Sequence, residues 1–103
     1  MTDFDVDLEA RDDELWVLPT GDLDLAAAPE LRETLSLALR SDAPAIVIDL
    51  RGLDFLDSTG LKALVEAHAG PDGHRVSFVH GNDIVEQVLT VSNLSEELRF
   101  RAP

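Results

Sequence analysis

The chain has 103 residues, of which 45% are hydrophobic, and it contains no cysteine. This length and composition are typical of a packed globule, so we expect one domain over residues 1–103. The lack of cysteine excludes disulfides, thiolate metal sites and a cysteine nucleophile. Twenty-one acidic against eight basic residues give a formal charge of −13, which repels nucleic acids and anionic membranes. We expect neither of them as a partner.

The ends and the apolar runs carry no targeting signal. Residues 1–5 are acidic and lack the basic and apolar regions of a signal peptide. No apolar run approaches the roughly 20 residues that a membrane-spanning helix needs. We expect a cytoplasmic protein.

The N-terminal third predicts a hairpin followed by a helix. Phe4, Val6 and Leu8 alternate with acids, which is the period of a half-buried strand with an acidic outer face. A second strand is expected over residues 15–18, with Trp16 as a packing residue and Pro19 as its end. Residues 21–25 are expected to form a loop, and a helix begins near Pro29.

The middle of the chain predicts a buried strand that leads to a helix. Residues 45–48 are an apolar, β-branched run typical of a central strand. After a turn at Gly52, the side chains of Leu53, Phe55 and Leu56 are expected to point inward. Ser58 then opens a helical pattern, which places it at a helix N-terminus that favours anions. Either Asp57 or Ser58 is expected to be the N-cap residue.

The last third predicts a strand over residues 75–79 and a helix with its cap residues at 81–83. Leu94, Leu98 and Phe100 are expected to pack the tail down, with a short helical turn starting at Ser95. The order predicts an α/β fold with a mixed sheet of four to five strands and helices mainly on one face. The acidic first strand is expected at an edge of the sheet.

Three kinds of chemistry can be weighed for these residues. A nucleophilic Ser58 lacks the Gly-X-Ser-X-Gly elbow and an oriented histidine, so serine hydrolysis is disfavoured. Asp22 and Asp24 could bind Mg²⁺, but a structural role at the helix entry is favoured for them, and we expect no metal or other cofactor. The remaining hypothesis is that Ser58 accepts a phosphate, which the helix dipole would stabilise.

Three groups of residues resemble the STAS domain and, within it, the bacterial anti-sigma factor antagonists. The resemblance covers residues 4–100. Its anchors are the runs Gly-Asp-Leu-Asp at 21–24 with Ala-Pro at 28–29, Ile-Asp-Leu at 48–50, and Phe-Leu-Asp-Ser-Thr-Gly-Leu at 55–61. Ala27 departs from the family, in which a Ser or Thr often stands before the Ala-Pro pair, so the helix there loses an expected cap.

The resemblance implies a binding module without catalysis of its own. The unphosphorylated protein would bind an anti-sigma factor that is also a serine kinase and so release a sigma factor. Phosphorylation of Ser58 would end the binding, and a phosphoserine phosphatase would reset it. An alternative is a STAS subunit of another assembly, such as a stressosome-like complex or a transporter. The residues expected to contact the partner are Asp22, Asp24, Asp57, Ser58, Thr59, Gly60 and Lys62.

Overall fold

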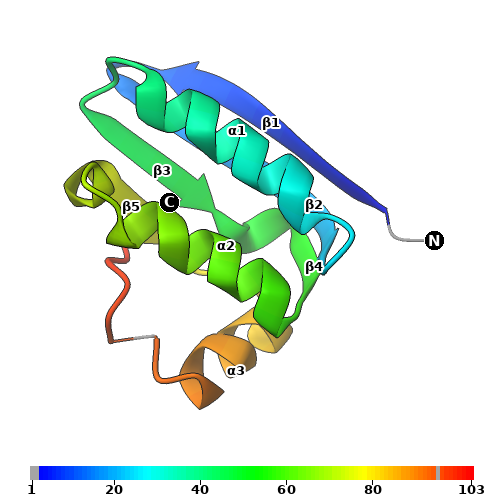
Figure 1. Cartoon of the computed structure of the whole chain (residues 1–103). Coiled ribbons are helices and arrows are strands. Elements are labelled where there is room, and N and C mark those ends of the chain that lie inside the picture. The colour runs from blue at the N-terminus through cyan, green and yellow to red at the C-terminus, as the bar shows by residue number, and fades with distance from the viewer. Residues whose placement is uncertain (1–2, 95) are drawn as a thin grey trace.

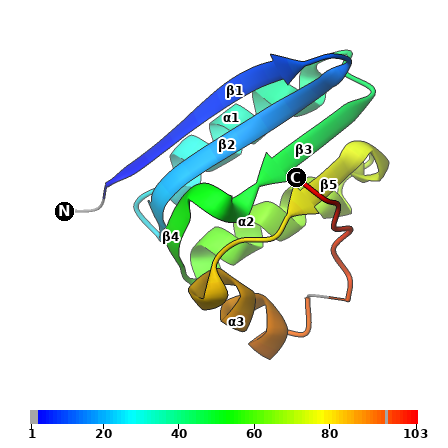
Figure 2. The ribbon, with the colours of Figure 1, turned by 180° about the vertical axis from the view of Figure 1, so that it is seen from behind.

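A mixed five-stranded sheet with helices mainly on one face forms the frame of the computed structural model, which describes residues 3–94 and 96–103 (Figure 1). Helices α1 and α2 lie side by side over one face of the sheet, and α3 lies at one end beside β4 (Figures 1 and 2). This confirms the predicted α/β class. In chain order the elements are β1 (Phe4–Arg11), β2 (Glu14–Leu23), α1 (Ala28–Arg40), β3 (Ala45–Asp49), the 3₁₀ turn η1 (Leu50–Gly52), β4 (Leu53–Leu56), α2 (Ser58–Ala69), the 3₁₀ turn η2 (Gly73–Arg75), β5 (Val76–Val79) and α3 (Asp83–Val91).

The strands follow the order β1-β2-β3-β5, with β4 also paired to β2. β1 and β2 are antiparallel, whereas β2 and β3, β3 and β5, and β2 and β4 are parallel. β1 therefore lies at an edge, as expected, and its residues Asp5, Asp7 and Glu9 are exposed there. These charges disfavour edge-to-edge pairing with another chain.

Strand β2 is longer than the sequence predicts, and this corrects two expectations. Pro19 does not end the strand, and residues 21–23 belong to it rather than to a loop. Residues 14–17 pair with β3, whereas residues 21–23 pair with β4. Because Pro19 lies where the partner changes from β3 to β4, neither pairing requires the amide proton that proline lacks.

The main core lies between the sheet and the helices. Fully buried side chains come from α1, α2 and α3 and from the strands that face them. They include Leu31, Leu64, Leu89, Ile46, Ile48 and Phe78, each 0% exposed. Leu53 and Leu56 join this core, but Phe55 is 44% exposed, so the prediction that it points inward is wrong. The pairing of β4 with β2 skips a residue between Leu53 and Phe55, so the alternation of faces is broken there. Leu53 and Leu56 can therefore both be buried while Asp54 and Phe55 between them are exposed.

The C-terminal third follows the expected pattern with small shifts. Strand β5 starts one residue later than predicted, at Val76, because residues 73–75 form η2. Asn82 caps α3 by accepting the amide proton of Val85 at 3.0 Å. Leu98 is buried, and Leu94 and Phe100 are half-buried, which confirms that the tail packs down. Ser95, where a helical turn is predicted to start, lies outside the described residues.

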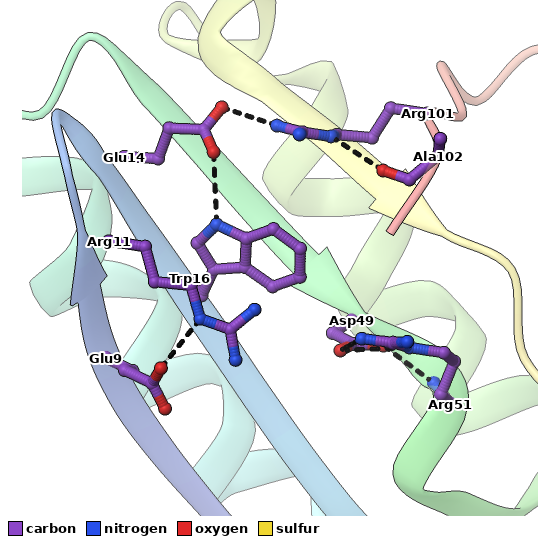
Figure 3. A network of polar contacts seen from close by, with 8 residues as sticks. All are labelled: Glu9, Arg11, Glu14, Trp16, Asp49, Arg51, Arg101 and Ala102. Atoms are coloured by element: carbon purple, nitrogen blue, oxygen red, sulfur yellow. Dashed lines mark hydrogen bonds and ion pairs between the residues drawn. The ribbon is translucent and has the colours of Figure 1, made fainter.

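On the other face of the sheet no helix lies among residues 3–94 and 96–103, and charged side chains lie there instead (Figure 3). Trp16, Val47 and Val79 form a small second apolar cluster there and are at most 3% exposed. Arg11 lies over the Trp16 ring at 4.0 Å, and Glu14 accepts the indole proton at 3.2 Å. Trp16 is therefore a packing residue, as predicted. Arg101 from the tail pairs with Glu14 and so joins the tail to β2.

Candidate functional site

Ser58 is the first residue of α2, and Asp57 is the residue that caps this helix. The Asp57 carboxylate accepts the amide proton of Gly60 at 2.9 Å, and Ser58 is exposed. No group within residues 3–94 and 96–103 hydrogen-bonds the Ser58 hydroxyl. The sequence left open whether Asp57 or Ser58 caps the helix, and in the structure the cap is Asp57. The cap leaves the Ser58 hydroxyl accessible to solvent.

The end of β2 fixes the position of this helix N-terminus. The amide of Asp57 donates to the carbonyl of Leu23 at 3.2 Å, and Leu23 pairs with Leu56 in the sheet. A Cβ atom at Gly60 would stand 2.5 Å from the same Leu23 carbonyl oxygen. Only glycine lets the first turn of α2 approach the strand this closely. The Asp57 to Gly60 turn is therefore held against the C-terminal end of β2.

Asp22 and Asp24 lie at the same end of β2. Asp22 pairs with Phe55 of β4, and the Asp24 carboxylate accepts the amide protons of Ala26 and Ala27 at 3.0 and 3.1 Å. Ala27, at the N-cap position of α1, provides no side-chain cap, as expected from its sequence. The Asp24 carboxylate, three residues before Ala27, accepts backbone amide protons in place of the missing side-chain cap. This confirms the structural role predicted for Asp24 at the helix entry.

The remaining predicted contact residues lie in the first two turns of α2. Thr59 is half-buried, and Lys62 is exposed on the next turn. The Arg32 guanidinium donates to Glu66 at 3.0 Å and holds the pKa of the Glu66 carboxyl below its usual range, and the charge of Lys62 lowers it a little further. The fold thus gathers all seven predicted contact residues around the junction of β2, β4 and α2.

Two exposed apolar residues at this junction were missed by sequence reasoning. Leu25, in the loop between β2 and α1, is 71% exposed, and Phe55 is 44% exposed. The position of Leu25 in a predicted loop, between Asp24 and Ala26, was a signal that it could be exposed. The sequence held no such signal for Phe55, because an aromatic residue in a strand is typical of a buried position. Asp54 is exposed beside Phe55, and Asp22 and Asp57 are half-buried at the same end of the sheet.

Two of the three histidines, His68 and His80, have defined surroundings away from Ser58. His80 contacts Glu86 at 2.6 Å and stacks on Phe100 with 3.8 Å between ring centroids. His68 is half-buried on α2, and its Nδ1 atom is buried with no hydrogen-bond partner among the described residues. Among the residues described, no group of three or more His, Asp or Glu side chains is arranged to hold a metal ion.

Most of the chain matches a known domain family. Residues 6–100 match the family model described as "Mlab, STAS domain". The chain belongs to the STAS domain family. The match spans nearly all of the sheet and its helices, including the β2 end, the Asp57 to Gly60 turn and α3. The resemblance deduced from the sequence motifs is therefore confirmed.

Solved structures of anti-sigma factor antagonists share the fold at low sequence identity. An anti-sigma factor antagonist from Mycobacterium paratuberculosis is 24% identical with a TM-score of 0.87, and the match covers 98% of this chain and 86% of that one. The antagonist SpoIIAA in its unphosphorylated form is 23% identical with a TM-score of 0.70, over 95% and 89% of the two chains. The phosphorylated form of the Bacillus SpoIIAA is 19% identical with a TM-score of 0.66, over 95% and 92%.

Within residues 3–94 and 96–103, no helix of the STAS domain has both the length and the apolar character to cross a bilayer.

Proposed function

We propose that this STAS domain is an anti-sigma factor antagonist that works by partner switching in the cytoplasm. Unphosphorylated, it binds an anti-sigma factor that is also a serine kinase, and the sigma factor held by that kinase is released. Phosphorylation of Ser58 ends the binding, and a phosphoserine phosphatase restores it. The domain itself catalyses nothing and needs no cofactor.

The observation that carries this proposal is the free, exposed hydroxyl of Ser58 at a helix that Asp57 already caps. A kinase needs a serine hydroxyl that it can reach without unfolding its substrate. A phosphate at this place meets the amide groups of the first helical turn, and the helix dipole stabilises it by about 0.3–1 kcal/mol. The fold therefore accepts the modified residue.

The surroundings of Ser58 explain why a phosphate would end the binding. Phosphorylation adds about −1.5 to −2 charges, next to the acids Asp22, Asp54 and Asp57. In solution this charge stays hydrated, but in a complex it would have to be buried or paired. An interface already matched to the unmodified acids has no further cation for it, so the complex is destabilised.

Relatives support the same function. The Mycobacterium paratuberculosis protein with this fold is an anti-sigma factor antagonist, and SpoIIAA occurs in unphosphorylated and phosphorylated forms. In this chain we assign the contact to Asp22, Asp24, Asp57, Ser58, Thr59, Gly60 and Lys62, and we add Leu25 and Phe55.

A kinase assay tests the proposal. The protein is incubated with each ATP-binding anti-sigma factor of its host and ATP, and any phosphate is located by mass spectrometry. We expect one phosphate per chain at Ser58, and none in the Ser58→Ala variant, which should still bind. Ser36→Ala removes another exposed serine, on α1, and should be phosphorylated like the wild type.

Binding measurements complete the test. Ser58→Glu should bind at least tenfold more weakly than wild type because it adds charge and bulk. A Ser58→Ala variant that is still fully phosphorylated would refute the assignment of the acceptor. Recovery of a multisubunit STAS assembly or a transporter in a pull-down, with no anti-sigma factor bound, would favour the alternative role.

A further inference from the structure

Strand β1 has hydrogen-bonding backbone groups that β2 does not use. The Asp3 carbonyl accepts the amide proton of Asp22 at 2.9 Å, and in an antiparallel pair the bonded residues alternate. Every second residue of β1 therefore points its amide and carbonyl away from β2. These residues are Phe4, Val6, Leu8 and Ala10. Their outward backbone groups make no hydrogen bond with any other group in residues 3–94 and 96–103.

The other end of the strand order is covered, in contrast to β1. The tail pairs with β5 there: the Phe78 amide donates to the Arg99 carbonyl at 2.8 Å, and the Arg101 amide donates to the Phe78 carbonyl at 2.9 Å. Figures 1 and 2 agree that β1 forms the margin of the sheet on the side away from α3. Within the described part of the chain, β1 is therefore an open edge.

Charge is the feature that guards this open edge. Short strands, bulges and prolines are common ways to block an edge, but β1 runs for eight residues in one continuous register with β2 and contains no proline. Its guard consists of Asp5, Asp7 and Glu9, which are all exposed. Like charges repel and opposite charges attract, so these acids disfavour a second copy of β1 and favour a basic strand.

The acids of β1 share the helix-free face of the sheet. Glu9 lies opposite Trp16 on β2, and Figure 3 shows both side chains on that face. Asp7 and Asp5 follow at steps of two residues and point to the same side. Glu9 pairs with Arg11 at 2.7 Å, whereas Asp5 and Asp7 form no ion pair among the residues described. Two carboxylates are therefore available to cations of an added strand.

The opposite face of β1 is apolar. Val6 is half-buried against the main core, and Leu8 is 40% exposed. Neighbouring strands place their paired side chains on the same face of a sheet, and successive side chains of a strand alternate between the faces. A strand added to β1 would thus meet acids with every second side chain and apolar groups with those between them. A segment in which Lys or Arg alternates with apolar residues fits both faces.

We propose that the open edge of β1 binds an extended segment of another protein in which Lys or Arg alternates with apolar residues, and that this segment adds a strand to the sheet. The outward backbone groups of residues 4–10 provide the hydrogen bonds, and the acids select a basic segment. This contact uses the edge away from α3, so the inference does not depend on the proposed function.

A synthetic peptide tests the contact. The blocked peptide Lys-Val-Lys-Val-Lys-Val has the required alternation, and Lys-Lys-Lys-Val-Val-Val is its control with the same composition and charge. We expect the first peptide to slow hydrogen exchange at the amides of Val6 and Leu8, and the control to bind at least tenfold more weakly. Equal binding of the two peptides, or no slowed exchange in residues 4–10, would show general charge attraction and overturn the inference.

A proline variant separates backbone pairing from charge. Leu8→Pro removes an outward amide proton that makes no bond to β2, and edge strands accept proline at such positions. We expect the affinity for the alternating peptide to fall at least tenfold, while circular dichroism shows the wild-type fold. Leu8→Thr loses the same side chain but keeps the amide proton, and it should bind within threefold of wild type. Wild-type affinity of a folded Leu8→Pro variant would contradict the inference.

Two further measurements cover the remaining outcomes. The double variant Asp5→Asn/Asp7→Asn keeps the backbone of β1, so it tests the edge even if Leu8→Pro does not fold. We expect it to bind the alternating peptide at least threefold more weakly than wild type, and equal binding would refute the role of the acids. A wild-type dimer in sedimentation experiments that Leu8→Thr retains and Leu8→Pro or the double variant alters would assign the edge to a second copy and overturn the inference.

Discussion

Asp57 accepts the amide proton of Gly60 at 2.9 Å, and this one hydrogen bond both starts α2 and leaves the neighbouring Ser58 hydroxyl free. If Ser58 were the cap, its oxygen would be occupied by a backbone amide. The division of roles between two adjacent residues therefore links the stability of the helix to the accessibility of the proposed acceptor.

Removing the cap should destabilise the fold. Asp57→Ala loses the bond to Gly60, and we expect the free energy of unfolding to fall by about 0.5–2 kcal/mol in urea denaturation. Asp57→Ser keeps a side-chain acceptor and should recover most of this loss. Equal stability of Asp57→Ala and the wild type would show that the bond does not contribute.

Gly60→Ala tests the close approach of α2 to β2. Alanine in a helix is favoured over glycine by about 1 kcal/mol, but here its Cβ would stand 2.5 Å from the Leu23 carbonyl oxygen. Because that oxygen belongs to the backbone, it cannot move aside as a flexible side chain would. We expect a net loss of about 1–3 kcal/mol in unfolding free energy.

Gly70→Ala is the matched control for Gly60→Ala. Its nearest neighbour would be the Glu66 carbonyl oxygen at 3.7 Å, an ordinary contact. The variant should unfold within about 0.5 kcal/mol of wild type. If both glycine variants behave alike, the proximity to Leu23 is not the cause.

Asp49 should give the protein a defined acid sensitivity. The carboxylate is 8% exposed, and burial alone would raise its pKa, but the hydrogen bonds from the Arg51 guanidinium and amide outweigh burial and hold the pKa below its usual value of 3.8. A lowered pKa in the folded state stabilises the fold above the unfolded pKa. This contribution is lost as the pH falls through the folded pKa, so stability should decrease below about pH 4.

Asp49→Asn isolates that charge, because Asn can still accept the Arg51 amide proton. We expect it to cost about 1 kcal/mol at pH 7, a modest value because Arg51 is half exposed. Urea denaturation at several pH values should show a smaller decrease in stability below pH 4 than in wild type. An unchanged pH profile would exclude Asp49 as its source.

The single tryptophan reports on the helix-free face of the sheet. Arg101→Ala removes the ion pair with Glu14 and one cation beside the Trp16 ring, so water should reach the indole. We expect a red-shifted emission and stronger quenching by acrylamide. Arg32→Ala, which breaks an ion pair with Glu66 on the helical face, should leave the emission unchanged.

The sequence by itself determined the class of fold and the family. Strand and helix periods depend only on local residue spacing, so β1, β3, α1, α2 and α3 were predicted near their true positions. The motif at residues 55–61 carried the resemblance to the STAS domain. Two of its residues are needed at particular backbone positions, because Asp57 caps α2 and Gly60 lies against the Leu23 carbonyl.

Only the tertiary structure decided which residues meet and which stay exposed. The length of β2 depends on its two successive partners, β3 and β4, and no local pattern encodes a change of partner. The exposure of Phe55, Ile84 and Val91 could not be predicted from the sequence, because an apolar residue gives the same sequence pattern whether its side chain is buried or exposed. Burial is set by what lies opposite a residue, and that is fixed only when the distant segments have packed.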